Sequence, residues 1–211
     1  MTEAKLTSEL TNLLRRLWAW PEKHPDLAGQ GIYPVGGKPD IIDLLLPVVI
    51  EVKVMTGPTW TRQALAFSRI TPEQRRWLSA WLANSRKTGA GAQAYLAVGT
   101  AHGRAGSNTN RRYAWLVPWE RWLEVEARLR PHRNSLPFIA FKGQKPKAVQ
   151  EQGLNAVRLL EPWALEWRDG LWHLPPGHEL TTLLLPVYFG SGERAPADWQ
   201  NLWRHADKED T

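Results

Sequence analysis

The sequence predicts a mixed α/β fold in which helices flank a central, mixed β-sheet. Within residues 1–130, segments with the three-and-four apolar spacing of helices alternate with short runs rich in Val, Ile and Leu. Their order is helix, hairpin, helix, strand, strand, helix, which favours helices packed over a sheet. We therefore expect a core of residues 1–130, followed by a C-terminal extension of residues 131–211.

The first expected helix covers residues 6–20, where leucines recur on one helix face and Pro21 ends the pattern. A stretch rich in Pro and Gly follows, and it excludes long regular structure. Two apolar runs, residues 40–46 and 48–54, then lie on either side of Pro47. They predict a hairpin of two short strands.

A second helix is expected to begin after Thr71, which can cap it, with Pro72 in the first helical position. Gln74 would complete a capping box, and the helix should run to about Asn84. The sequence then predicts, in order, a strand over residues 93–99, a polar basic loop over 100–112, a strand over 113–118 and a helix over 118–130.

The extension has weaker periodicity than the core. Asp169 and Gly170 stand between alternating apolar residues and predict a two-residue β-hairpin. Residues 181–189 are a further strand candidate. The sequence leaves open whether the extension adds to the sheet or forms its own lobe.

Composition excludes several classes of protein. Cysteine is absent, so disulfides, a thiol nucleophile and a Cys-based zinc site are excluded. The histidines form no metalloprotease motif, and we expect His173 and His178 to be surface residues. Because the longest apolar run spans only residues 44–50, we expect a soluble, cytoplasmic protein without a membrane span.

Positive charge is concentrated in the core. Residues 1–130 hold 18 Lys and Arg against 11 Asp and Glu, whereas residues 131–211 hold 9 against 10. Such a surplus is typical of a domain that binds a polyanion, although a solvated basic surface has the same composition. Arg104, Arg111 and Arg112 belong to the polar loop, where they either contact phosphates or lie on a mobile segment.

The expected hairpin carries ionisable residues among apolar ones: Asp40, Glu51 and Lys53. Alternation along a strand places Glu51 and Lys53 on one face. A turn centred on residues 46–47 or 47–48 brings Asp40 to that same face, whereas a three-residue loop brings Asp43 there instead. We prefer Asp40.

Two carboxylates a few ångströms apart repel unless a cation lies between them. Magnesium suits such a site, because it prefers oxygen and is commonly held by one or two carboxylates together with water and phosphate. A neighbouring lysine can stabilise the charge that develops during phosphodiester hydrolysis. These residue types therefore point to metal-dependent hydrolysis of a phosphodiester.

At these positions the chain resembles the PD-(D/E)xK nuclease superfamily, through Pro39-Asp40 and Glu51-Val52-Lys53. The resemblance covers roughly residues 3–130 and implies a restriction-endonuclease-like core. It also implies that Asp40, Glu51 and the carbonyl of Val52 bind Mg²⁺, with Mn²⁺ as a substitute, and that Lys53 is the catalytic lysine. The alternative is a salt-bridged pair of strands.

The same resemblance suggests two further site residues. Glu9 lies in the first helix, where many members carry a glutamate that faces the metal; the alternative is a solvated helix position. Gln74 lies where related Holliday junction resolvases have a glutamine, and its capping role explains it equally well.

We therefore expect a Mg²⁺-dependent DNA endonuclease of recombination or repair that acts on branched DNA, similar to Holliday junction resolvases, as a homodimer. The tryptophan-rich extension could form the dimer surface or could cover the sheet. The alternatives are a repair or restriction-like nuclease for linear duplexes, and a DNA-binding module that does not cleave.

Overall fold

The central feature of the computed structural model is a five-stranded sheet. The structure describes residues 1–17, 21–23, 39–43, 48–59, 62–88, 93–102, 111–138 and 154–180. In spatial order the strands of the sheet are β1 (Pro21–Lys23), β2 (Ile41–Asp43), β3 (Val48–Val54), β5 (Gln93–His102) and β6 (Arg111–Pro118). The β3–β5 pair is parallel and the other pairs are antiparallel, so the sheet is mixed, as predicted.

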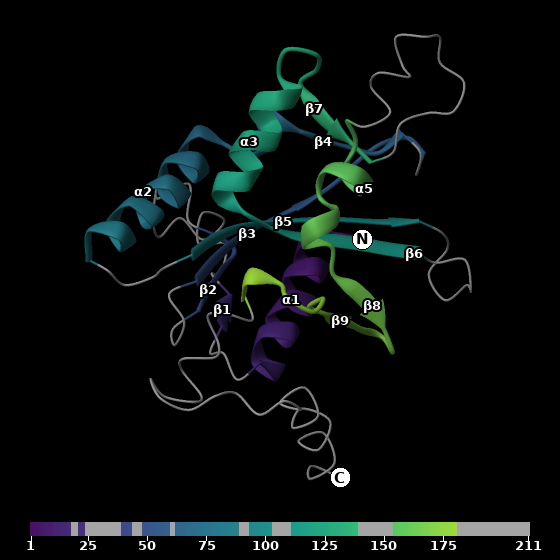
Figure 1. Ribbon diagram of the computed structural model, residues 1–211. Coiled ribbons are helices and arrows are strands. Elements are labelled where there is room, and N and C mark those ends of the chain that lie inside the picture. Colours follow the sequence, from purple (N-terminus) through teal and green to yellow (C-terminus); the bar gives the residue numbers. More distant parts are fainter. Residues whose placement is uncertain are drawn as a thin grey trace, which may run out of the picture.

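Helices cover both faces of this sheet (Figure 1). On one face lies α1 (Glu3–Arg16), and on the other lie α2 (Pro72–Thr88) and α3 (Trp119–Leu129). Because parallel strands need a long crossover, the chain passes through α2 between β3 and β5. The prediction of a mixed α/β fold with flanking helices is confirmed. None of the helices in the described ranges is long and apolar enough to cross a membrane.

Local sequence explains how α1 forms. The hydroxyl of Thr2 caps the helix by accepting from the backbone N–H of Lys5 at 3.2 Å. Four leucines of the expected stripe are buried against the sheet: Leu6, Leu10, Leu13 and Leu14. The amphipathic pattern therefore fixes which side of α1 meets the sheet.

Strand β3 is buried along its whole length, because it lies between β2 and β5 and under helices on both faces. Val48, Ile50, Val52 and Val54 belong to the apolar cluster around α1, whereas Val49 packs on the side of α2 and α3. Alternation therefore directs Glu51 and Lys53 toward the face covered by α2 and α3.

The hairpin register places Asp40 next to Glu51. Ile41 pairs with Ile50 and Ile42 with Val49, so the next position of the ladder sets Asp40 opposite Glu51. The observed pairing is shifted by an even number of residues from each of the two expected registers. Because side chains alternate between the faces of a sheet, an even shift keeps Asp40 on the same face as Glu51. Asp43 is out of phase with Asp40, and its side chain lies outside the described residues.

Three element boundaries differ from the sequence prediction. The helix α1 begins at Glu3 and ends at Arg16, whereas residues 6–20 were expected. The β5–β6 ladder continues from Tyr95↔Pro118 to His102↔Arg111, so the expected loop over 100–112 is strand at both ends. The helix α2 ends at Thr88 rather than near Asn84. Cross-strand pairing explains the longer strands, since it supports strand even where composition is polar.

The described part of the extension packs against the core. Strand β7 (Ser135–Pro137) pairs with β4 (Ala64–Ala66), and a hairpin is formed by β8 (Glu166–Arg168) and β9 (Leu171–His173). Its turn residues have positive φ, 54° at Asp169 and 79° at Gly170, as expected for a type I′ turn.

The link between this hairpin and β7 includes the short helices α5 (Ala156–Leu159) and η4 (Glu161–Trp163). After η4, Leu165 donates its N–H to the carbonyl of Ala114 on the edge strand β6, at 2.8 Å. Trp172 is buried in the cluster around α1. The strand candidate at 181–189 lies outside the described residues.

Candidate active site

Asp40 lies at the edge of β3 where pairing with β2 ends. Its Oδ2 accepts from the backbone N–H of Val52 at 2.7 Å. Because the N–H and C=O of one strand residue point to the same edge, the carbonyl of Val52 faces the side on which Asp40 lies. The carboxylate of Asp40 thus replaces a ladder partner and is anchored beside β3.

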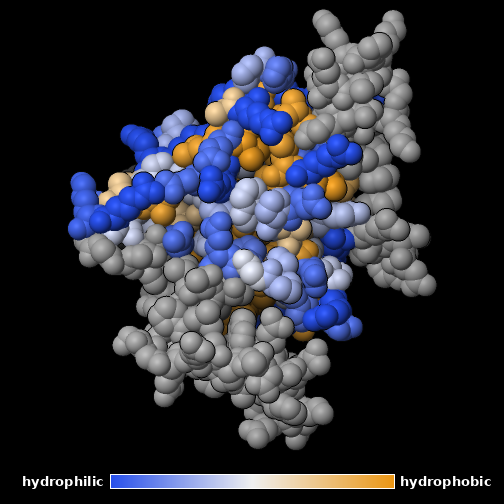
Figure 2. Space-filling view, viewed as in Figure 1, coloured by the Kyte–Doolittle hydropathy of each residue, from blue (hydrophilic) through white to orange (hydrophobic). Residues whose placement is uncertain are grey.

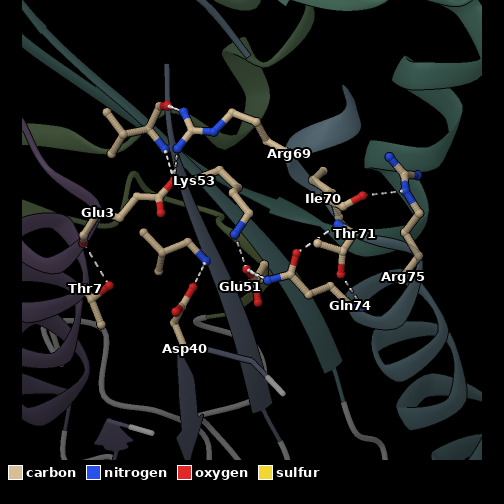
Figure 3. Close-up of polar contacts among 12 residues, drawn as sticks. Glu3, Thr7, Asp40, Glu51, Lys53, Arg69, Ile70, Thr71, Gln74 and Arg75 are labelled. Atoms are coloured by element: carbon tan, nitrogen blue, oxygen red, sulfur yellow. Dashed lines mark hydrogen bonds and ion pairs between the residues drawn. The ribbon is translucent and has the colours of Figure 1, made fainter. Parts of the chain in front are cut away.

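Glu51 is the most deeply buried member of the cluster, with 1% of its surface exposed. Its Oε1 accepts from the ammonium of Lys53 and from the side-chain amide of Gln74 (Figure 3). Its other oxygen, Oε2, is buried and has no hydrogen-bond partner in the part of the chain that the structure describes. A buried acceptor without a partner is costly and marks a place where a ligand could bind.

Burial makes ionisation of both carboxyl groups unfavourable. The pKa of Glu51 rises from 4.5 to about 8, mainly through desolvation and then through the nearby charge of Asp40, and these effects outweigh the opposing effect of Lys53. The pKa of Asp40 is also raised by desolvation, against the backbone hydrogen bond from Val52. Such a pair is stabilised in its ionised form by a cation.

Gln74 caps α2 and also contacts Glu51. Its Oε1 accepts from the N–H of Thr71 at 3.0 Å, and its own N–H donates to the hydroxyl of Thr71 at 3.2 Å, which completes a capping box. Its Nε2 donates to Glu51. The cap therefore also brings the Gln74 amide to the cluster.

Glu3 is a cluster residue that sequence reasoning missed. It lies in the first turn of α1, where Oε1 accepts from the N–H of Val54 at 3.3 Å and forms an ion pair with Arg69 at 2.5 Å. Arg69, in the 3₁₀ helix η3 (Phe67–Arg69), also donates to the carbonyl of Val54. Glu3 precedes the buried Leu10 by seven residues, so the leucine stripe itself could have identified this position.

Glu9 has neither of the two expected environments. Its Oε1 pairs with Arg112 at 2.6 Å, and its Oε2 accepts from the indole N–H of Trp172 at 2.9 Å. Six residues separate it from Glu3, which corresponds to about 9 Å along the helix and about a third of a turn around it. Glu9 thus holds β6 and β9 against α1, and we correct its assignment as a site residue.

The arginines of the expected loop are only partly described. Arg104 and the side chain of Arg111 lie outside the described residues. Arg112 is engaged by Glu9, and its guanidinium lies 4.2 Å from the ring centroid of Trp167. Only 15% of the Arg112 side chain is exposed, which does not favour the expected phosphate contact.

The expectation that His178 is a surface residue is wrong. Its ring is buried, with Nε2 located 3.3 Å from the carbonyl of Leu116 and Nδ1 accepting from the N–H of Leu180. Its pKa is lowered by burial, so the neutral imidazole is favoured. The sequence missed this because the extension folds back onto β6.

The residues present fit a magnesium ion of the kind held by two carboxylates. No group of three or more His, Cys, Asp or Glu side chains in the described ranges could hold a metal ion. Mg²⁺ needs only one or two carboxylates when water and substrate phosphate complete its shell. Oε2 of Glu51 is a buried oxygen that meets no hydrogen-bond partner within the described ranges, and Asp40 is the second carboxylate.

Comparisons with known protein families, with curated proteins and with solved structures gave no match to this chain.

Proposed function

We propose that this protein is a magnesium-dependent DNA endonuclease with Asp40, Glu51 and Lys53 at its centre. The observation that carries the proposal is the buried carboxylate of Glu51. Lys53 and Gln74 donate to one of its oxygens, and the other has no partner among the described residues. A purely structural salt bridge has no need for an acidic pair in which burial raises both pKa values.

Each residue has a distinct role in this proposal. Bound magnesium would polarise the scissile phosphate and favour ionisation of a water nucleophile. Asp40 and Glu51 would hold the ion, with the carbonyl of Val52 as a further oxygen ligand. Lys53 lies two residues beyond Glu51 on the same strand face, where its ammonium would stabilise negative charge developing on the phosphate oxygens.

Basic side chains along α2 favour a polyanionic substrate. Arg76, Arg86 and Lys87 of α2 are exposed, and Figure 2 shows mostly hydrophilic residues on the visible side of this helix. Gln74 links the first turn of α2 to Glu51. A DNA strand whose phosphates bind along α2 would therefore run toward the carboxylates of Asp40 and Glu51.

The preference for branched DNA and the homodimer are the finer parts of the proposal. Paired incisions of a four-way junction need two centres, and a two-fold dimer supplies them. Trp172 does not support the dimer, because it is buried within its own chain. The proposal of a homodimer therefore depends on the need for two centres to make paired incisions.

The test is cleavage of linear, flapped, forked and four-way DNA of matched sequence in Mg²⁺, Mn²⁺, Ca²⁺ or chelator. We expect cleavage with Mg²⁺ and Mn²⁺, and binding without turnover with Ca²⁺, whose larger and looser shell positions water poorly. Glu120→Gln is the control for Glu51→Gln, because Glu120 is an exposed glutamate in an ion pair.

The outcomes separate the alternatives. Cleavage in chelator would overturn the metal mechanism. A monomer that cuts linear and branched DNA equally would favour a repair or restriction-like nuclease. Binding of DNA without cleavage in any ion would favour a DNA-binding module.

A further inference from the structure

The amide of Gln74 is held in one orientation. Its Oε1 accepts from the backbone N–H of Thr71, which can only donate, so Nε2 is the end that faces Glu51. A flipped amide would place an acceptor against a carboxylate oxygen and a donor against another donor. The orientation of this amide therefore depends on where the first turn of α2 lies.

Arg75 fixes that turn to its surroundings. Its Nε donates to the carbonyl of Ile70 at 3.1 Å and its Nη2 to the carbonyl of Phe67 at 3.0 Å. The same guanidinium forms a two-bond pair with Glu126 of α3, at 2.7 and 2.9 Å. One side chain thus ties the residues before α2 to α3, and Figure 3 shows its bond to the carbonyl of Ile70.

Glu126 is buried, with 2% of its surface exposed, and also accepts from Arg130. A buried ion pair is weak evidence for a contribution to stability, because well-packed apolar residues often serve equally well. An apolar pair could not make the hydrogen bonds that Arg75 donates to the carbonyls of Ile70 and Phe67.

We infer that Arg75 and Glu126 form a positioning pair for the candidate active site. By fixing the first turn of α2 they aim the Gln74 amide at Oε1 of Glu51. Two donors on Oε1 then fix the carboxylate, so that Oε2 is presented to a divalent cation. The link to a cation rests on the proposed function, whereas the orientation of Gln74 does not.

The experiment follows the side-chain amide of Gln74 in ¹H–¹⁵N spectra of the metal-free protein. Its signals are assigned by their loss in Gln74→Ala. The test variants are Arg75→Lys, which keeps the charge but not the forked geometry, and the double variant Arg75→Met/Glu126→Leu, which keeps an apolar contact. Mn²⁺ affinity of each variant is measured by titration.

Arg86→Lys is the matched control. Arg86 also pairs with a glutamate of α3, Glu120, at 2.5 Å. It lies eleven residues along α2 from Arg75, about 16 Å away along the helix axis. The Arg86→Lys substitution therefore perturbs the α2–α3 contact without altering the turn that carries Gln74.

In both test variants we expect the two amide proton shifts to move toward those of free glutamine, and their solvent exchange to become about tenfold faster. Mn²⁺ binding should weaken about tenfold, the lower end for residues that orient metal ligands. The control should match the wild type in all three measurements.

Unchanged Gln74 signals in a folded Arg75→Lys or double variant would overturn the inference and leave the pair a structural one. The same change of the Gln74 signals in the control would also overturn it, since any disturbance of α2 would then suffice. If the Gln74 signals change in the test variants but the wild-type protein cuts no DNA, the proposed function is refuted and the positioning role of Arg75 and Glu126 is retained.

Discussion

Replacing Glu51 with glutamine should change how stability depends on pH. The folded protein keeps the Glu51 proton up to a pKa of about 8, whereas the unfolded chain loses it near 4.5. Between these values the folded state binds more protons, so the free energy of unfolding falls as pH rises. The stabilising effect of the proton is fully present below pH 4.5 and is lost above about 8.

The magnitude follows from that interval. The two pKa values differ by about three and a half pH units, and each unit is worth about 1.4 kcal/mol. The free energy of unfolding of the wild type should therefore fall by at most about 5 kcal/mol across this interval. Glutamine cannot ionise, so Glu51→Gln should lack this loss and should become the more stable protein at pH 8. Asp40 acts in the same direction, because its pKa is also raised.

The assay is urea denaturation of both proteins at pH 5, 6, 7 and 8 in chelator. We expect the difference in unfolding free energy to grow steadily with pH. Adding Mg²⁺ at pH 8 should raise the free energy of unfolding of the wild type but leave that of the variant unchanged, because the ion stabilises the ionised pair. Glu120→Gln should show neither effect. Parallel pH curves for wild type and Glu51→Gln would refute the reasoning.

Other expected outcomes concern single residues. Lys53→Ala should lower cleavage of four-way DNA about 100-fold with little change in DNA binding, and near wild-type turnover would exclude a catalytic role. Asp40→Asn should abolish cleavage, whereas Asp43→Asn should be much milder; the reverse result would contradict the hairpin register. Arg112→Ala should cost about 1–3 kcal/mol in urea denaturation because it breaks a half-buried ion pair, without changing the salt slope of DNA binding. His178→Gln should flatten the loss of stability as pH falls below 6.5, since the pKa of the buried ring is lowered and its neutral form is stabilised.

The local elements could be predicted because each depends on neighbouring residues. The stripe from Leu6 to Leu14, the capping box of Thr71 and Gln74, and the Asp169–Gly170 turn all act over a few residues. The phase of Asp40 with Glu51 was also predictable, because any even shift of the hairpin preserves it.

Contacts between distant segments were decided only by the tertiary structure. Glu9 and Glu3 are both glutamates of one helix, yet Glu9 meets Arg112 and Trp172, which lie 103 and 163 residues away. Glu3 instead meets Val54 and Arg69 at the end of β3. The choice depends on which strand ends lie beside each turn of α1.

The chemical types at the site were thus determined by the sequence, and their surroundings by the fold. A motif of Asp, Glu and Lys specifies charge and alternation, which act along one hairpin. The burial of Glu51 to 1% exposure and the fixed amide of Gln74 arise when α2 packs over the sheet, and in the described part of the chain this packing leaves Oε2 of Glu51 without a hydrogen-bond partner. Desolvation is a property of the packed layers and not of the hairpin alone, and for this reason the raised pKa of Glu51 emerged only from the tertiary structure.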